Sequence, residues 1–145
     1  MKQFKIFTIN ALIIMLFSCQ VNAQDEQEPK SESTNKIEVI DFHSTHRCMT
    51  CNAIEANTKY TLNTYFADEL KEKTITFQSV NIDEEVNYKM AEKFEASGTS
   101  LFLNVIINGE ETIINLTDFA FSKGRKKEAF SKELKSKIET ELEKL

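Results

Sequence analysis

Two cysteines stand three positions apart in the segment Cys48-Met49-Thr50-Cys51. This spacing suits reversible disulfide chemistry, a metal site or a purely structural disulfide. The third cysteine of the chain, Cys19, lies far upstream, so the pair does not belong to a framework of several disulfides. The pair is therefore predicted to be the chemical centre of the chain, and thiol chemistry is favoured over metal binding.

The position of the pair supports this prediction. A short apolar run rich in β-branched residues predicts a strand over residues 36–44, and apolar residues at helical spacing predict a helix over about residues 51–72. A helix N-terminus carries unpaired N–H groups and a partial positive charge. A thiolate at Cys48 would be stabilised there, with the neighbouring Arg47 as a second positive charge, and its pKa is expected to fall below that of a free thiol.

The two cysteines are predicted to have different roles. Cys48 would be the exposed, attacking thiol. Cys51 lies one helical turn further on, close enough to resolve a mixed disulfide and to close the disulfide Cys48–Cys51.

The remaining segments predict an α/β domain. They are, in order, a strand (74–82), a helix (83–96), two strands (101–107 and 111–116) joined by the hairpin turn Asn108-Gly109, a linker (118–124) and a final helix with Phe130, Leu134, Ile138 and Leu142 in an i+4 stripe. A strand–helix–strand unit implies a parallel pair with a right-handed crossover, and the hairpin adds an antiparallel strand. The expected order βαβαββα gives a four-stranded mixed sheet with helices on both faces.

Several segments resemble the thioredoxin superfamily. They are residues 40–42 before the motif, residues 80–83, residues 96–100 and the turn Asn108-Gly109-Glu110. The resemblance covers nearly all of residues 36–145 and implies a thioredoxin-like fold with thiol–disulfide exchange. More narrowly, residues 42–48 and 51–55 resemble a small exported group labelled the nitrophenyl compound nitroreductase subunit ArsF family. Nothing in the sequence indicates a flavin site or another bound cofactor.

The resemblance implies roles for two more residues. Asp41 matches the buried acid that assists deprotonation of the resolving cysteine in thioredoxin; the alternative is a partly exposed aspartate at a strand end. Ser100 stands where the superfamily has a cis-proline that shapes the substrate surface. A cis bond before a residue other than proline costs about 3–4 kcal/mol, so a trans bond is expected here. The missing proline also keeps open a non-catalytic accessory subunit.

The chain's two histidines, His43 and His46, lie close before the motif. With Cys48 and Cys51 they could supply two nitrogens and two sulfurs to zinc, and Met49 is a soft ligand suited to Cu(I). His43 is expected to point away from the cysteines. His46 is the better candidate, either as a ligand or as a base near Cys48.

The N-terminus predicts export. Residues 1–23 combine Lys2 and Lys5, a short apolar run and small residues at the end, which is typical of a cleaved signal peptide. Alternatively, Cys19 would be lipidated and become the only membrane attachment. Residues 24–35 are polar and are expected to form a linker, leaving residues 36–145 as the folded domain. The predicted location is the periplasm or cell envelope, with a protein thiol or disulfide as partner.

Charge argues against nucleic acid as a partner. The net charge is −5, and without residues 1–23 the chain keeps 16 basic against 23 acidic residues. One basic cluster stands at the start of the last helix: Lys123, Arg125, Lys126 and Lys127. It is expected to be a solvated face, with docking of an anionic partner as the alternative.

Overall fold

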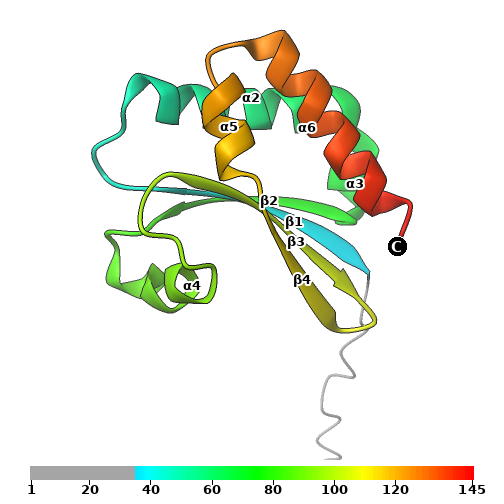
Figure 1. Ribbon diagram of the computed structural model, residues 1–145. Coiled ribbons are helices and arrows are strands. Elements are labelled where there is room, and N and C mark those ends of the chain that lie inside the picture. The colour runs from blue at the N-terminus through cyan, green and yellow to red at the C-terminus, as the bar shows by residue number, and fades with distance from the viewer. Residues whose placement is uncertain (1–34) are drawn as a thin grey trace, which may run out of the picture. The chain divides into compact units, whose positions relative to one another are not determined.

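Four strands form one mixed sheet in the order β2-β1-β3-β4 (Figure 1). They are β1 (Lys36–His43), β2 (Ile75–Asn81), β3 (Ser100–Ile107) and β4 (Glu110–Asn115). β1 pairs with β2 in parallel and with β3 antiparallel, and β3 pairs antiparallel with β4. This is the α/β, thioredoxin-like arrangement that the sequence predicts. The computed structural model describes residues 35–145, so the predicted signal peptide, Cys19 and residues 24–34 lie outside the described residues.

Helices cover both faces of the sheet, as expected (Figure 1). One face carries α2 (Met49–Tyr65), α3 (Ala67–Glu72), α5 (Thr117–Lys123) and α6 (Lys127–Leu142); the other carries the 3₁₀ turn η2 (Glu85–Asn87) and α4 (Tyr88–Lys93). Within residues 35–145, no helix has the length and apolar character needed to cross a bilayer.

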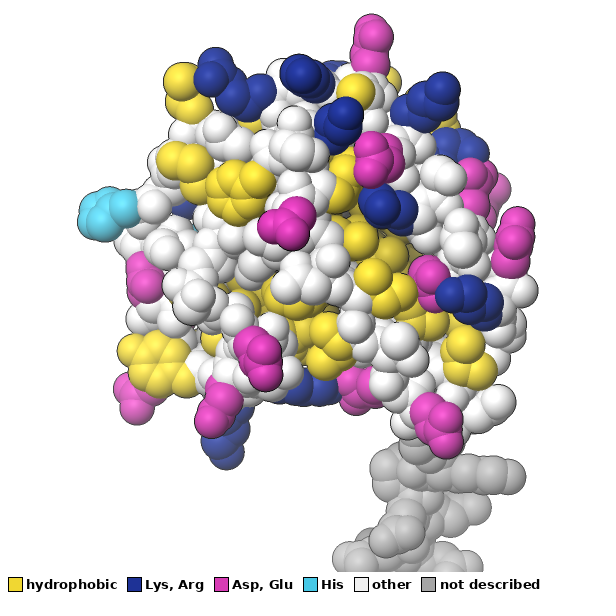
Figure 2. All heavy atoms as spheres, viewed as in Figure 1, with side chains coloured by type: hydrophobic (Ala, Val, Ile, Leu, Met, Phe, Trp, Pro, Cys, Tyr) yellow, Lys and Arg dark blue, Asp and Glu magenta, His cyan; other side chains and the backbone are white. Residues whose placement is uncertain are grey.

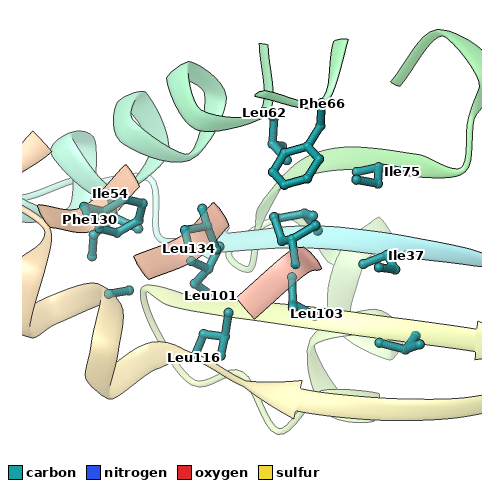
Figure 3. Close-up of a cluster of buried hydrophobic side chains, with 14 residues drawn as sticks. Ile37, Ile54, Leu62, Phe66, Ile75, Leu101, Leu103, Leu116, Phe130 and Leu134 are labelled. Atoms are coloured by element: carbon teal, nitrogen blue, oxygen red, sulfur yellow. The ribbon is translucent and has the colours of Figure 1, made fainter. Parts of the chain in front are cut away.

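Alternation along β1 divides the core between these faces. Ile37 and Val39 join the larger cluster, in which Figure 3 shows side chains of α2, α6 and the strands pointing toward one another. Ile40 and Phe42 join the smaller cluster under α4. Because side chains alternate between the faces of a strand, Asp41 shares the α2 face with Ile37 and Val39.

Three predicted elements differ from the structure. The helix expected over residues 51–72 breaks at Phe66, whose backbone leaves helical geometry while its side chain is buried in the core. The segment expected to be a linker at 118–124 instead forms most of α5. At the start of this helix, Asn115 Oδ1 accepts the Thr117 N–H (2.9 Å). The helix expected over 83–96 shortens to η2 and α4. Val86, which lies in the part of the expected helix that η2 replaces, is 84% exposed.

Asn35, the first residue that the structure describes, forms hydrogen bonds with two distant parts of the domain. Asn35 Nδ2 donates to the Leu145 carbonyl (2.7 Å), and Asn35 Oδ1 accepts the Asn108 N–H (2.9 Å). Asn35, predicted as the last linker residue, therefore joins Leu145, which follows α6, to the β3–β4 hairpin.

A close approach fixes the α5–α6 connection against α2. A Cβ added at Gly124 would lie 2.9 Å from Ile54 Cγ1, 3.2 Å from Thr50 Cγ2 and 2.7 Å from the Ala120 carbonyl oxygen. Asn57 Nδ2 donates to the Gly124 carbonyl in a buried hydrogen bond of 2.7 Å. The connection is thus held against the first turns of α2, next to the cysteine motif.

Gly124→Ala is therefore expected to destabilise the domain by about 1–3 kcal/mol, because the added methyl group would lie within 3.0 Å of a backbone oxygen and of the buried Ile54 side chain. Urea unfolding monitored by circular dichroism measures this change. Gly98→Ala is the matched control, since a Cβ at Gly98 meets nothing within 4 Å. It is expected to be neutral or stabilising by about 0.4–1 kcal/mol. Equal effects of the two variants would contradict the close-approach argument.

Candidate active site

The cysteine pair forms a disulfide at the start of α2. Cys48 is the N-cap residue, and its sulfur accepts the backbone N–H of Cys51 at 3.1 Å. The Cα atoms of the bonded cysteines are 5.1 Å apart. Cys48 is exposed, whereas Cys51 is only 7% exposed. An incoming group can therefore reach one sulfur of the pair more readily than the other.

The loop that carries the motif rests on the exit of β2. The Thr45 N–H donates to Asp83 Oδ2 (2.7 Å), Asn81 Nδ2 donates to the Thr45 hydroxyl (3.1 Å), and the Ile82 N–H donates to the His43 carbonyl (2.8 Å). The hydrogen bonds from Thr45 hold the pKa of Asp83 below its usual value. These contacts fix the path of the chain between β1 and the first turn of α2.

Arg47 lies between two carboxylates beneath the motif. Its Nη2 is 3.1 Å from Asp41 Oδ2, and its Nη1 pairs with Glu55 Oε2. The same Nη2 donates to the Cys51 carbonyl at 3.4 Å. Within residues 35–145 the guanidinium of Arg47 thus bonds to Asp41, Glu55 and the Cys51 carbonyl. The sequence had predicted that its charge would lie beside the Cys48 sulfur.

Asp41 is wholly buried, on the α2 face of the sheet, and is not a partly exposed strand-end residue. Burial raises its pKa from 3.8 to about 7, while the nearby Arg47 guanidinium acts in the opposite direction. Its second oxygen, Oδ1, has no hydrogen-bond partner among the described residues. A carboxyl group that titrates near neutral pH can give or take a proton under ordinary conditions.

Glu55 is the member of this cluster that the sequence analysis missed. It pairs with Arg47 and also with Lys59, whose Nζ lies 2.5 Å from Glu55 Oε1. The i,i+4 spacing of Glu55 and Lys59 is visible in the sequence. The pairing with Arg47 is not, because it depends on the path of the loop before α2.

Ser100 begins β3 and lies opposite Phe42 of β1. Every peptide bond of residues 35–145 is trans, as expected for a serine at this position. The Ser100 hydroxyl donates to the Gly98 carbonyl at 3.1 Å. An open cleft of about 470 Å³ adjoins it, formed by residues 95–100, Phe102, Asn115, Thr117 and Asp118. The cysteines do not line this cleft.

The histidines do not form a metal site with the cysteines in this structure. His43 Nδ1 contacts the Ser44 carbonyl (3.0 Å), and His46 is exposed on the loop. In the part of the chain that the structure describes, no three His, Cys, Asp or Glu side chains are grouped to hold a metal ion. The set of four ligands considered from the sequence is thus not assembled here.

Among the comparisons with known proteins, similar chains are found among solved structures. No family model matches the chain, and no curated protein matches it. Among solved structures, Fasciola hepatica thioredoxin is 18% identical, with 63% of this chain and 80% of that chain covered and a TM-score of 0.40. Oxidized mitochondrial thioredoxin 3 from Saccharomyces cerevisiae is 22% identical, with 63% and 78% covered and a TM-score of 0.41. A structure described as a malarial protein is 19% identical, with 61% and 96% covered and a TM-score of 0.39. Likeness at this level assigns no activity to the chain.

Proposed function

We propose that the domain carries out thiol–disulfide exchange through Cys48 and Cys51. The observation that carries this proposal is the asymmetry of the pair: the exposed residue Cys48, at the N-cap of α2, is bonded to the buried Cys51, and the Cys48 sulfur accepts a backbone N–H. Backbone N–H groups and the positive end of a helix stabilise a thiolate at the same place. Cys48 is therefore the attacking thiol and Cys51 the resolving thiol.

In the reducing direction, the Cys48 thiolate attacks a partner disulfide, whose S–S bond breaks and releases one partner thiolate. Cys51 then loses its proton and attacks the Cys48 sulfur of the mixed disulfide. The second partner thiolate leaves, and the bond Cys48–Cys51 forms. Two electrons pass to the partner, and the reverse sequence oxidises a partner dithiol.

Asp41 is proposed as the proton acceptor for Cys51. It is buried on the α2 face, and the Arg47 guanidinium contacts both its carboxylate and the Cys51 carbonyl. Arg47 is thus a positioning residue that ties the acid to the backbone of the resolving cysteine.

The proposal extends to location and partner. The pattern of residues 1–23, or lipidation at Cys19, would place the domain in the cell envelope. Its partner there would be a protein disulfide or dithiol. The narrower ArsF-family resemblance rests on residues around the motif and adds no nitro-group chemistry.

Alkylation of the reduced domain at a series of pH values tests the proposal. Cys48 is expected to react at pH values where a free cysteine is still protonated, because its thiolate is stabilised at the helix start. The domain should also reduce bis(2-hydroxyethyl) disulfide and reach a measurable equilibrium with glutathione. Alkylation like that of a free cysteine, together with no exchange, would instead favour a non-catalytic accessory role.

A further inference from the structure

A basic turn, defined here as Lys123, Arg125, Lys126 and Lys127, lies at the junction of α5 and α6 at the protein surface. Among residues 35–145, none of the four lies within 4.0 Å of a carboxylate. By contrast, Lys135 and Lys137 of α6 are paired with glutamates of their own helix. The positive charge of the basic turn is therefore not neutralised within the domain.

The basic turn is part of a wider charge asymmetry. Residues 123–137 contain seven basic and two acidic residues, in a chain whose net charge is −5. Figure 2 shows Lys and Arg side chains gathered along the upper edge of the molecule, over the α5–α6 connection and α6. A local field of this sign on an acidic protein favours one orientation of a charged partner.

The basic turn is held in place beside the cysteine motif. Gly124, in its middle, lies against Thr50, which stands between the two cysteines, and its carbonyl accepts the buried hydrogen bond from Asn57. Lys127 Nζ lies 3.4 Å from the centre of the Tyr60 ring, which fixes the turn to α2 a second time. The backbone of the basic turn is thus packed against α2, which places its charges next to the cysteine motif.

We propose that the basic turn selects protein partners that carry acidic residues beside the disulfide to be exchanged. The inference rests on the proposed function, since it names the partner class of the same site. Exchange requires the partner's disulfide to contact the exposed Cys48, so residues flanking that disulfide come close to the turn. Acidic flanking residues are attracted there, whereas the rest of the chain carries a net negative charge.

Two disulfide-bridged peptides of equal length test the proposal, one flanked by glutamates and one by lysines. At low ionic strength the reduced domain is expected to reduce the acidic peptide about tenfold faster, although its net charge alone favours the basic one. The preference should vanish near 1 M salt, where charges are screened within about 3 Å. Equal rates in low salt, or a faster reaction with the lysine peptide, would overturn the proposal.

The double variant Arg125→Glu, Lys126→Glu should lose or reverse the preference. The matched control is Lys71→Glu, Lys89→Glu, which changes two exposed lysines outside the turn and alters the net charge equally. It should keep the preference. If both double variants lose it equally, net charge alone is responsible and the basic turn has no special role.

Two further measurements separate this proposal from the proposed function. Reaction with bis(2-hydroxyethyl) disulfide, which is small and neutral, reports the thiol chemistry alone. Chemical-shift changes at residues 123–127 on titration with a cysteine-free acidic peptide report the surface alone, and their absence would overturn the inference. Binding to phosphatidylglycerol vesicles through the turn, without any peptide preference, would assign it to a membrane surface and also overturn the inference.

Discussion

Cys48→Ser is expected to abolish thiol–disulfide exchange, whereas Cys51→Ser should complete the first attack and stop at the mixed disulfide. The loss for Cys48→Ser should be on the order of 1,000-fold or more, as when a covalent nucleophile is removed. The reason is the asymmetry of the pair, in which Cys48 is exposed at the N-cap of α2 and Cys51 is buried. Mass spectrometry of each reduced variant with a disulfide peptide measures the adduct directly.

The double variant Cys48→Ser, Cys51→Ser is the control and should form no adduct. Comparing all forms in the reduced state removes the effect of losing the disulfide on stability. A stable adduct on Cys48→Ser, with none on Cys51→Ser, would show that the attacking and resolving roles are reversed.

Asp41→Asn is expected to change how the stability of the domain depends on pH. The pKa of Asp41 is raised from 3.8 to about 7, mainly by burial, so the folded protein binds a proton that the unfolded chain has lost between these values. Ionisation of Asp41 therefore lowers the stability of the wild-type protein as pH rises from about 4 to about 7, with no further loss above that range. Asparagine does not ionise and avoids this loss.

The stability of Asp41→Asn relative to the wild type should therefore increase with pH, by up to roughly 4 kcal/mol between pH 4 and pH 8. Urea unfolding at both pH values, with the pair Cys48–Cys51 kept oxidised, measures the difference. Asp118→Asn removes the same charge from an exposed position and should follow the wild-type trend. A constant difference between Asp41→Asn and the wild type at all pH values would contradict a raised pKa at Asp41.

The strands were predictable because their signals are local. A run of apolar β-branched residues indicates β1, and Asn108-Gly109 indicates the hairpin between β3 and β4. The structure follows both signals, with Asn108 and Gly109 at φ values of 53° and 85°. The parallel pairing of β1 with β2 then follows from the helical connection between them, which returns the chain to the same end of the sheet.

The short helices were not predictable from spacing alone. Val86 lies four residues before Met90 in an i+4 pattern, yet η2 replaces the first turn of the expected helix. Asn87 Nδ2 donates to the Asn81 carbonyl (2.9 Å), and a side chain of this type competes with helix formation by bonding the local backbone. Such competition depends on where β2 ends, which the helical pattern does not encode.

In the site, the sequence predicted the location of the cysteine pair but not the partners of Arg47. The pair follows from spacing at a strand-to-helix junction, which is a local signal. The contacts of Arg47 with Asp41 and Glu55 join a strand, a loop and the second turn of a helix. The geometry of these contacts is decided by the fold as a whole. From the sequence alone, Arg47 was assigned to Cys48 because the two residues are neighbours in the chain.

The hydrogen bond between Asn35 and Leu145 has a practical consequence for attaching the domain to a solid support. Both residues lie near the Lys36 end of β1, whereas the cysteine motif follows its His43 end, about 26 Å away along eight residues. Figure 1 shows the C-terminus and the β1–α2 connection on opposite sides of the domain. An electrode or resin coupled at either residue therefore leaves the disulfide facing outward, toward the dissolved reactant.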